Sequence, residues 1–311
     1  MSAKHSKNFI LLFITAIIWG VAFVAQSAGM DYVGPYTFNA VRCLLGGIVL
    51  IPCVIFLNRS GKKNVEKSGG TEEKKVLDRP GDLLIGGLLC GFMMFVSTTL
   101  QQVGIAYTTV AKAGFITALY IIIVPILGIF LKRKAGMKIW ISVAIALIGL
   151  YLLCMKGSFS LSKGDFLILT CSICFAIHIM VVDHFTEKVS GTKLSCIQFL
   201  FAGVLSSVLM FAFEEPHWAD IFAAWLPICY AGILSCGVAY TFQIIGQRGT
   251  DPTIASLILS LESVVSVLAG WIILGQTLTG REILGCVLMF GAIILAQINP
   301  KKKDLLIQKK L

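Results

Sequence analysis

Charged residues are scarce in this chain. Only 14% of its 311 residues are Asp, Glu, Lys or Arg, whereas 57% are hydrophobic. A soluble domain of this length could not bury so much apolar surface, because there would not be enough core to hold it. The composition therefore excludes a soluble protein and predicts an all-α integral membrane protein with the lipid bilayer as its main solvent.

The motifs of common enzyme classes are missing as well. The sequence contains no GxSxG, no HExxH, no phosphate-binding P-loop and no GxGxxG followed by an acidic partner. We therefore expect no enzymatic activity and no cofactor. Since the ATP-binding motif is among those missing, any transport by this chain would be secondary or facilitative.

Neither a metal site nor a nucleic-acid surface is indicated. Cys171 and Cys174 form the only close cysteine pair, and no second CxxC or set of histidines accompanies them. Cysteine inside an apolar run is more often a small packing residue than a metal ligand. The net charge of +10 does not form a basic stripe with interleaved aromatic residues, so we expect no nucleic-acid partner.

Long apolar runs fill most of the chain. A helix needs about 20 residues to cross a hydrocarbon core of about 30 Å. Runs of this kind predict ten transmembrane helices, at 9–29, 35–57, 83–103, 111–131, 139–155, 165–182, 195–213, 221–245, 253–274 and 282–298.

The basic residues predict the orientation of these helices. If the N-terminus lies inside, the inner loops and tails hold 21 of the 26 Lys and Arg residues, and basic residues tend to stay in the cytoplasm. We therefore expect a multi-pass protein of the cell (plasma) membrane with both termini cytoplasmic. The segment 58–82, with seven basic and five acidic residues, is expected to be a mobile cytoplasmic loop, and 301–311 a basic cytoplasmic tail.

Part of the sequence repeats itself. Ala111–Leu153 aligns without a gap with Thr253–Leu295, and the same register places Thr108 on Thr250 and Tyr120 on Glu262. We call this register the repeat alignment. The short connection after Leu153 divides the chain into residues 1–157 and 158–300, with five predicted spans in each. Because five is odd, the second half must enter the membrane from the opposite side, which predicts two inverted five-helix repeats that can alternately open a central site.

Glu262 lies inside the ninth apolar run, about ten residues or roughly 15 Å from its nearer end. A charge at that depth costs at least about 2.5–3.5 kcal/mol on insertion scales, and the side chain is too short to reach the surface. Glu262 is therefore a candidate for solute binding and for proton coupling, with Ser266 on the same helix face. The alternative is a protonated glutamate that hydrogen-bonds a neighbouring helix as structural glue.

Other polar groups are candidates for the wall of the same cavity. Arg42 could hold an anionic group or pair with Glu262, although it is also long enough to snorkel. Pro125 removes a backbone donor in the fourth run, and we expect a kink there beside Thr117 and Tyr120, either as a cavity wall or as a packed bend. The full set of expected substrate-binding residues is Trp19, Phe23, Gln26, Asn39, Arg42, Gln101, Thr117, Tyr120, Glu262 and Ser266.

Three segments resemble a known family. These are Ile17-Ile18-Trp19-Gly20, Asn39-Ala40-Val41-Arg42 and the stretch 256–295. They are similar to the EamA family of the drug/metabolite transporter superfamily, over almost the whole chain outside 58–82. A proline often follows the family's glutamate in the ninth span, where this chain has Ser263. The resemblance implies ten helices in two inverted repeats and the export or facilitated passage of small metabolites.

The combined expectation is a secondary or facilitative exporter of amino acids or similar solutes, which works by alternating access around a cavity between the repeats. One alternative is a proton-coupled exporter of hydrophobic drugs or cations that uses Glu262. A more distant alternative is a membrane-embedded handler of a lipid-linked intermediate. The expected partners are a small-molecule solute and the lipid bilayer, with the protein as a monomer or a homodimer.

Overall fold

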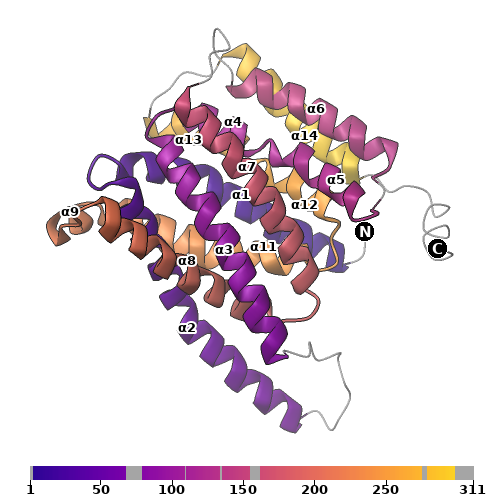
Figure 1. Cartoon of the computed structure of the whole chain (residues 1–311). Helices are drawn as coiled ribbons and strands as arrows, with labels where there is room; N and C mark the ends of the chain where they lie inside the picture. Colours follow the sequence, from indigo (N-terminus) through magenta and orange to yellow (C-terminus); the bar gives the residue numbers. More distant parts are fainter. Residues whose placement is uncertain are drawn as a thin grey trace.

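The computed structural model describes residues 3–67, 79–108, 110–133, 135–154, 162–274 and 279–297, and every element in them is a helix (Figure 1). Eight helical segments are long and apolar enough to cross a membrane, and Met137–Leu152 is a shorter apolar helix. The chain is therefore an all-helical, multi-pass membrane protein. Helices overlap each of the ten predicted runs, and the number that cross the bilayer stays a prediction.

The helices of the first half are α1 (Ala3–Gly29), α2 (Pro35–Lys67), α3 (Pro80–Ile105), α4 (Val110–Thr117), α5 (Tyr120–Phe130) and α6 (Met137–Cys154). Those of the second half are α7 (Lys163–Phe185), α8 (Gly191–Phe213), α9 (Trp218–Ala223), α10 (Trp225–Cys229), the π-helix η1 (Tyr230–Ala239), α11 (Tyr240–Gln247), α12 (Pro252–Leu259), α13 (Glu262–Leu274) and α14 (Gly280–Gln297).

The hydrophilic segment between α2 and α3 is shorter than the predicted loop 58–82. Helix α2 continues to Lys67, because its Lys, Arg and Glu residues favour a helix, and α3 begins at Pro80, a residue suited to the first helical position. The loop prediction was therefore wrong at both ends. Residues 68–78 and the predicted tail 301–311 lie outside the described residues.

Two of the apolar runs are broken helices. The first breaks at Ala118–Leu119, between α4 and α5, and the second breaks at Ser260–Leu261, between α12 and α13. The repeat alignment places these two breaks at the same position in both copies. Both are tightened by backbone bonds of the i→i+3 type, such as Ile121 N to Ala118 O at 3.1 Å and Ser263 N to Ser260 O at 3.1 Å.

The sequence predicts a kink at Pro125, beside Thr117 and Tyr120. Pro125 lies inside α5, and the helix is interrupted ahead of it, between Ala118 and Leu119. The second copy breaks at the corresponding place although it has no proline there, so a break at this position does not require a proline. In that copy the Ser260 hydroxyl donates to Leu257 O at 2.8 Å, a bond that bends helices.

Helices α2 and α8 pack against each other through reciprocal contacts. A Cβ atom added to Gly47 would lie 2.8 Å from Leu200 Cδ2, and one added to Gly203 would lie 2.7 Å from Leu44 Cδ2. Each helix thus offers a leucine and, three positions later, a glycine, and each glycine meets the leucine of the other helix. Since the later residue of one helix contacts the earlier residue of the other, the two helices run antiparallel.

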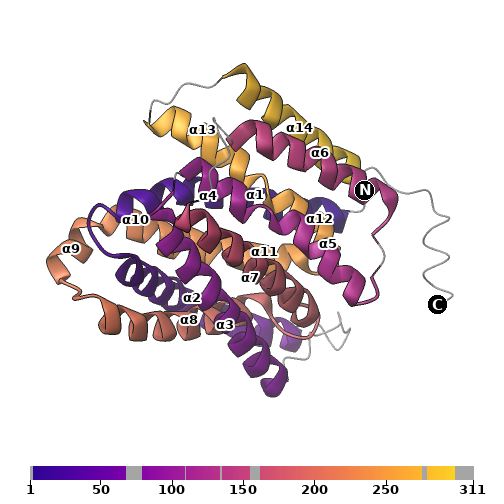
Figure 2. The same cartoon turned by 45° about the horizontal axis from the view of Figure 1, so that its top comes forward.

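Helices α6 and α14 lie side by side at one edge of the molecule (Figures 1 and 2). A Cβ atom on Gly149 would lie 2.9 Å from Gly285 O, and the Arg281 guanidinium carbon lies 5.2 Å from the centre of the Tyr151 ring. The later residue of α6 thus contacts the earlier residue of α14, and this pair is antiparallel as well.

Candidate functional site

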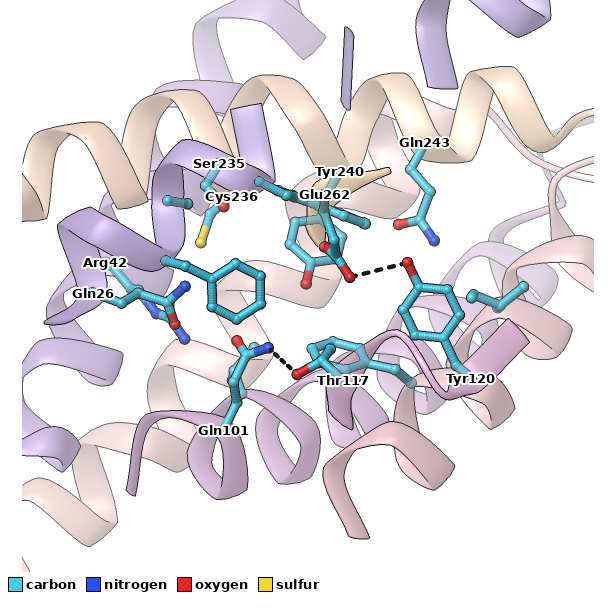
Figure 3. A pocket seen from close by; sticks show the side chains of 16 residues that line it. Gln26, Arg42, Gln101, Thr117, Tyr120, Ser235, Cys236, Tyr240, Gln243 and Glu262 are labelled. Carbon is cyan, nitrogen blue, oxygen red and sulfur yellow. Dashed lines mark hydrogen bonds between the residues drawn. The ribbon is translucent and has the colours of Figure 1, made fainter. Parts of the chain in front are cut away.

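A cavity lies in the middle of the molecule, between α1, α2, α3, α7, η1, α11 and the two broken helices (Figure 3). It holds about 540 Å³ of space between the atoms, counted out to its open mouth. Both halves of the chain supply its wall. Its lining includes eight of the ten residues expected from the sequence, namely Trp19, Phe23, Gln26, Arg42, Gln101, Thr117, Tyr120 and Glu262.

Asn39 and Ser266, the other two expected residues, do not line this cavity. The Asn39 amide donates to Ser206 Oγ at 3.0 Å, and its oxygen accepts a hydrogen bond from Arg42 Nε at 3.0 Å. Asn39 thus lies behind Arg42 and orients it. Ser266 donates to Ser263 O at 2.8 Å and lies where α13 packs against Gly114.

The Glu262 carboxyl contacts Tyr120, the residue that corresponds to it in the first copy of the repeat. Tyr120 Oη donates a hydrogen bond to Glu262 Oε1 at 3.0 Å, and both side chains are buried, with 2% and 4% exposed. Tyr120 is the first residue of α5, and Glu262 is the first residue of α13. The start of a helix is where the helix dipole favours a negative group. The two breaks therefore bring a phenol and a carboxyl together in the cavity wall.

Arg42 is buried, with 2% of its surface exposed, so it does not snorkel to the membrane surface. Its guanidinium lies 5.6 Å from the centre of the Phe38 ring and forms no ion pair with a carboxylate of the described residues. Figure 3 shows Arg42 and Glu262 apart, with Arg42 beside Gln26 and Glu262 beside Tyr240. Within the described part of the chain, the pairing of Arg42 with Glu262 considered from the sequence does not form.

Four buried polar atoms of the cavity wall have no hydrogen-bond partner among the described residues. They are Arg42 Nη2, Trp19 Nε1, Gln26 Oε1 and Gln243 Oε1. Buried polar groups in proteins nearly always have a partner. Two donors and two acceptors are therefore free to bind whatever enters the cavity, whether a solute or water.

Comparisons with known proteins show what kind of protein carries this cavity. The model of the EamA-like transporter family matches residues 6–155 and 162–297. The chain belongs to the EamA-like transporter family. It is 27% identical to an uncharacterized transporter of Archaeoglobus fulgidus over 289 residues, which cover 93% of this chain and 85% of that protein. It is also 27% identical to the uncharacterized inner membrane transporter YedA of Escherichia coli K12 over 298 residues, which cover 93% of this chain and 90% of YedA.

A solved crystal structure has the same fold as this EamA-family chain. The two superpose with a TM-score of 0.74 over 98% of this chain and 99% of the other, at 18% sequence identity. Together with the family, these relatives identify a multi-pass membrane transporter and not an enzyme. The resemblance noted in the sequence, and the exclusion of enzymatic activity, are thereby confirmed.

Sequence reasoning missed one whole side of the transporter's cavity. This side comes from η1 and α11 and consists of Ser235, Cys236, Tyr240 and Gln243, and further lining residues are Ala22, Thr98, Phe175 and Ile179. Tyr240 packs against Trp19, with ring centroids 4.4 Å apart. A glutamine inside an apolar run is unusual, so Gln243 could have been found by the same reasoning as Glu262. The π-helical turn that aims Ser235 and Cys236 inward has no comparable signal in the sequence.

Proposed function

We propose that this protein is a secondary or facilitative transporter that exports amino acids or similar small solutes by alternating access. One observation carries the proposal. Among the described residues, the buried guanidinium of Arg42 at one end of the central cavity has no anionic partner, and the buried carboxyl of Glu262 has a phenol as its hydrogen-bond partner. A cavity of this kind is suited to a solute that brings its own anionic group.

Alternating access requires two related halves, which we take to be inverted five-helix repeats over residues 1–157 and 158–300. The antiparallel pairs α2–α8 and α6–α14 support this, because each pairs a helix with the helix at the same place in the other half. The bond between Tyr120 and Glu262 adds to it. A residue that touches its own counterpart lies near the axis relating two copies, so the cavity would lie on that axis.

Arg42 is the residue proposed to hold the solute's anionic group. A guanidinium presents a planar set of donors that matches a carboxylate, and Arg42 Nη2 has no partner among the described residues. Arg42 Nε donates a hydrogen bond to Asn39, so Nη2 is the guanidinium nitrogen that remains for a solute in the cavity. The aromatic rings of Trp19 and Tyr240 supply an apolar wall for the rest of the solute.

The proposed orientation places both termini in the cytoplasm of a cell whose plasma membrane holds the transporter, as a monomer or a homodimer. In this orientation α1 and α3 end on the outer side, so Gln26 and Gln101 lie in the outer half of the cavity. Export would then carry the solute from the inner ends of the broken helices past Glu262 toward Arg42.

Counterflow in proteoliposomes tests the proposal. Vesicles loaded with one amino acid are expected to accumulate the labelled amino acid from outside, in a panel that also includes nucleosides. An Arg42→Gln variant should take up anionic or zwitterionic solutes about tenfold or more less well, since a lost charge-assisted bond is worth about 1.5–3 kcal/mol. Arg281→Gln is the matched control, because Arg281 stacks on Tyr151 at the edge of the molecule. No counterflow with any solute of the panel would contradict the proposal.

A second candidate is a proton-coupled exporter of hydrophobic drugs or cations that uses Glu262. The burial of this carboxyl favours it, whereas the guanidinium in the same cavity disfavours a cationic cargo that brings no anionic group of its own. The same vesicles, run with and without a pH gradient, separate the two. If Glu262 couples transport to protons, Glu262→Gln should abolish the response to the gradient while counterflow without a gradient persists. A wild-type protein that ignores the gradient would exclude this candidate.

A further inference from the structure

Gln243 lines the cavity but has no part in the function proposed above. It is 1% exposed, it lies on α11, and its amide oxygen has no hydrogen-bond partner among the described residues. Burying an amide oxygen without a partner is costly, and structures rarely retain such a group without a reason. An oxygen that faces a cavity is ready to accept a hydrogen bond from a ligand.

The neighbours of Gln243 are also acceptors. Figure 3 shows Gln243 on the same side of the cavity as Glu262 and Tyr120. The Tyr120 hydroxyl already donates its hydrogen bond to Glu262 Oε1, so it adds no free donor to this region. We call Gln243 and Glu262 the acceptor pole of the cavity. A group that donates hydrogen bonds or carries positive charge would be stabilised there.

Figure 3 shows Arg42 at one end of the cavity and Gln243 towards the other, with Glu262 beside Tyr240 between them. An α-amino acid carries its carboxylate and its α-ammonium on one carbon atom, so a molecule held at Arg42 by its carboxylate keeps its α-ammonium close to Arg42. The end of a long side chain is the part of the molecule that extends away from Arg42, towards Gln243. The Tyr240 ring, which packs on Trp19, offers an apolar surface for the methylene groups in between.

We infer that Gln243 and Glu262 select amino acids whose side chain ends in a nitrogen donor, with lysine as the simplest case. This inference rests on the proposed function and adds to it the class of side chain. Arg42 then binds the carboxylate that all amino acids share, while the acceptor pole distinguishes one amino acid from another.

Lysine and norleucine provide the test, because they share a carbon skeleton and differ in the terminal ammonium. In counterflow at one pH and without a gradient, the wild-type transporter is expected to prefer lysine by about tenfold or more. Gln243→Leu should reduce this preference by about fivefold or more, and Gln243→Glu should retain or raise it. Arg42→Gln should weaken the uptake of both amino acids together.

Gln247→Leu is the matched control for the cost of replacing a buried glutamine in α11. Gln247 is fully buried one turn further along, its amide oxygen also lacks a partner among the described residues, and it does not line the cavity. It should keep the wild-type preference for lysine. Equal uptake of lysine and norleucine by the wild type, or an unchanged preference in Gln243→Leu, would overturn the inference and leave the proposed function intact. If no amino acid is carried at all, the proposed function fails and this inference fails with it.

Discussion

Among the described residues, the buried Glu262 carboxyl accepts one side-chain hydrogen bond. Its donor, Tyr120, is brought within 3.0 Å by the break between α4 and α5, and no basic side chain of the described residues pairs with the carboxyl. Arg42, elsewhere in the cavity wall, donates a hydrogen bond to Asn39 instead. At the scale of the residue, then, the charges of the cavity are kept apart from each other, which leaves each of them for a solute.

Removing the Tyr120 hydroxyl should destabilise the protein. A Tyr120→Phe variant leaves the buried carboxyl of Glu262 without its donor, and an unsatisfied buried group costs about 1–3 kcal/mol. The measurement is the free energy of unfolding in mixed micelles. Tyr230→Phe is the control, since the half-buried Tyr230 hydroxyl donates only to the Ile18 carbonyl, at 3.1 Å, a bond worth about 0.5–1.5 kcal/mol. A Tyr120→Phe protein as stable as the wild type would show that this bond does not hold the carboxyl.

At the scale of the helix, the position of α13 depends on its close approach to α1. A Cβ atom on Gly20 would lie 2.4 Å from Val265 Cβ and 2.7 Å from the backbone oxygen of Glu262. Neither atom can move without shifting a helix. Because α1 also carries Trp19 and Gln26, this contact sets the distance between two walls of the cavity.

Gly20→Ala should therefore destabilise the protein by about 1–3 kcal/mol, the usual cost of overpacking. The same substitution at Gly291 in α14, where a Cβ atom would meet nothing within 4 Å, should be neutral or stabilising by up to about 1 kcal/mol, because alanine favours a helix. Thermal unfolding of the two variants in detergent makes the comparison. Equal unfolding midpoints for the two variants would mean that α1 and α13 can move apart without loss of stability, which would contradict the prediction.

At the scale of the whole molecule, different contacts hold the helices together at the two ends of the transporter. Thr108 and Thr250 correspond in the repeat alignment. Thr108 donates to Asp165, which also binds Lys112 at 3.1 Å, so this end holds an ion pair. Thr250 accepts from the neutral amide of Asn8, at 3.2 Å, and the ion pair at its end is formed by other residues, Arg133 and Asp183. In the proposed orientation the end with Asp165 faces the outside.

Weakening the ion pair should open the cavity to the outside more often. In a protein whose only cysteine is Cys236, which lines the cavity, Asp165→Asn should speed labelling by a membrane-impermeant thiol reagent added outside by about fivefold or more. Asp183→Asn is the control, since it breaks the pair with Arg133 at the other end of α7. Faster labelling in the control but not in Asp165→Asn would reverse the proposed orientation.

The sequence predicted much of this site because burial in a membrane makes polar residues conspicuous. Glu262 and Arg42 were found from their depth in apolar runs, and Tyr120 from its place beside Pro125 and opposite Glu262 in the repeat alignment. All three line the cavity. Asn39 and Ser266 were chosen by helix face alone, and both point into contacts between helices instead. A helix face predicts which residues lie together, but it cannot say which neighbour that face will meet.

By itself, the sequence determined that the protein is an all-helical membrane protein and that it belongs to a transporter family. It also determined that two stretches of it correspond to each other in one ungapped register. These properties follow from the composition and the order of the residues, because each apolar segment in the bilayer must satisfy its own backbone hydrogen bonds and therefore forms a helix. Only the tertiary structure decided that Tyr120 and Glu262 touch, that Arg42 stays unpaired with Glu262, and that Gln243 reaches the cavity. Those contacts depend on how helices far apart in the chain cross and where they break, and no local pattern encodes that packing.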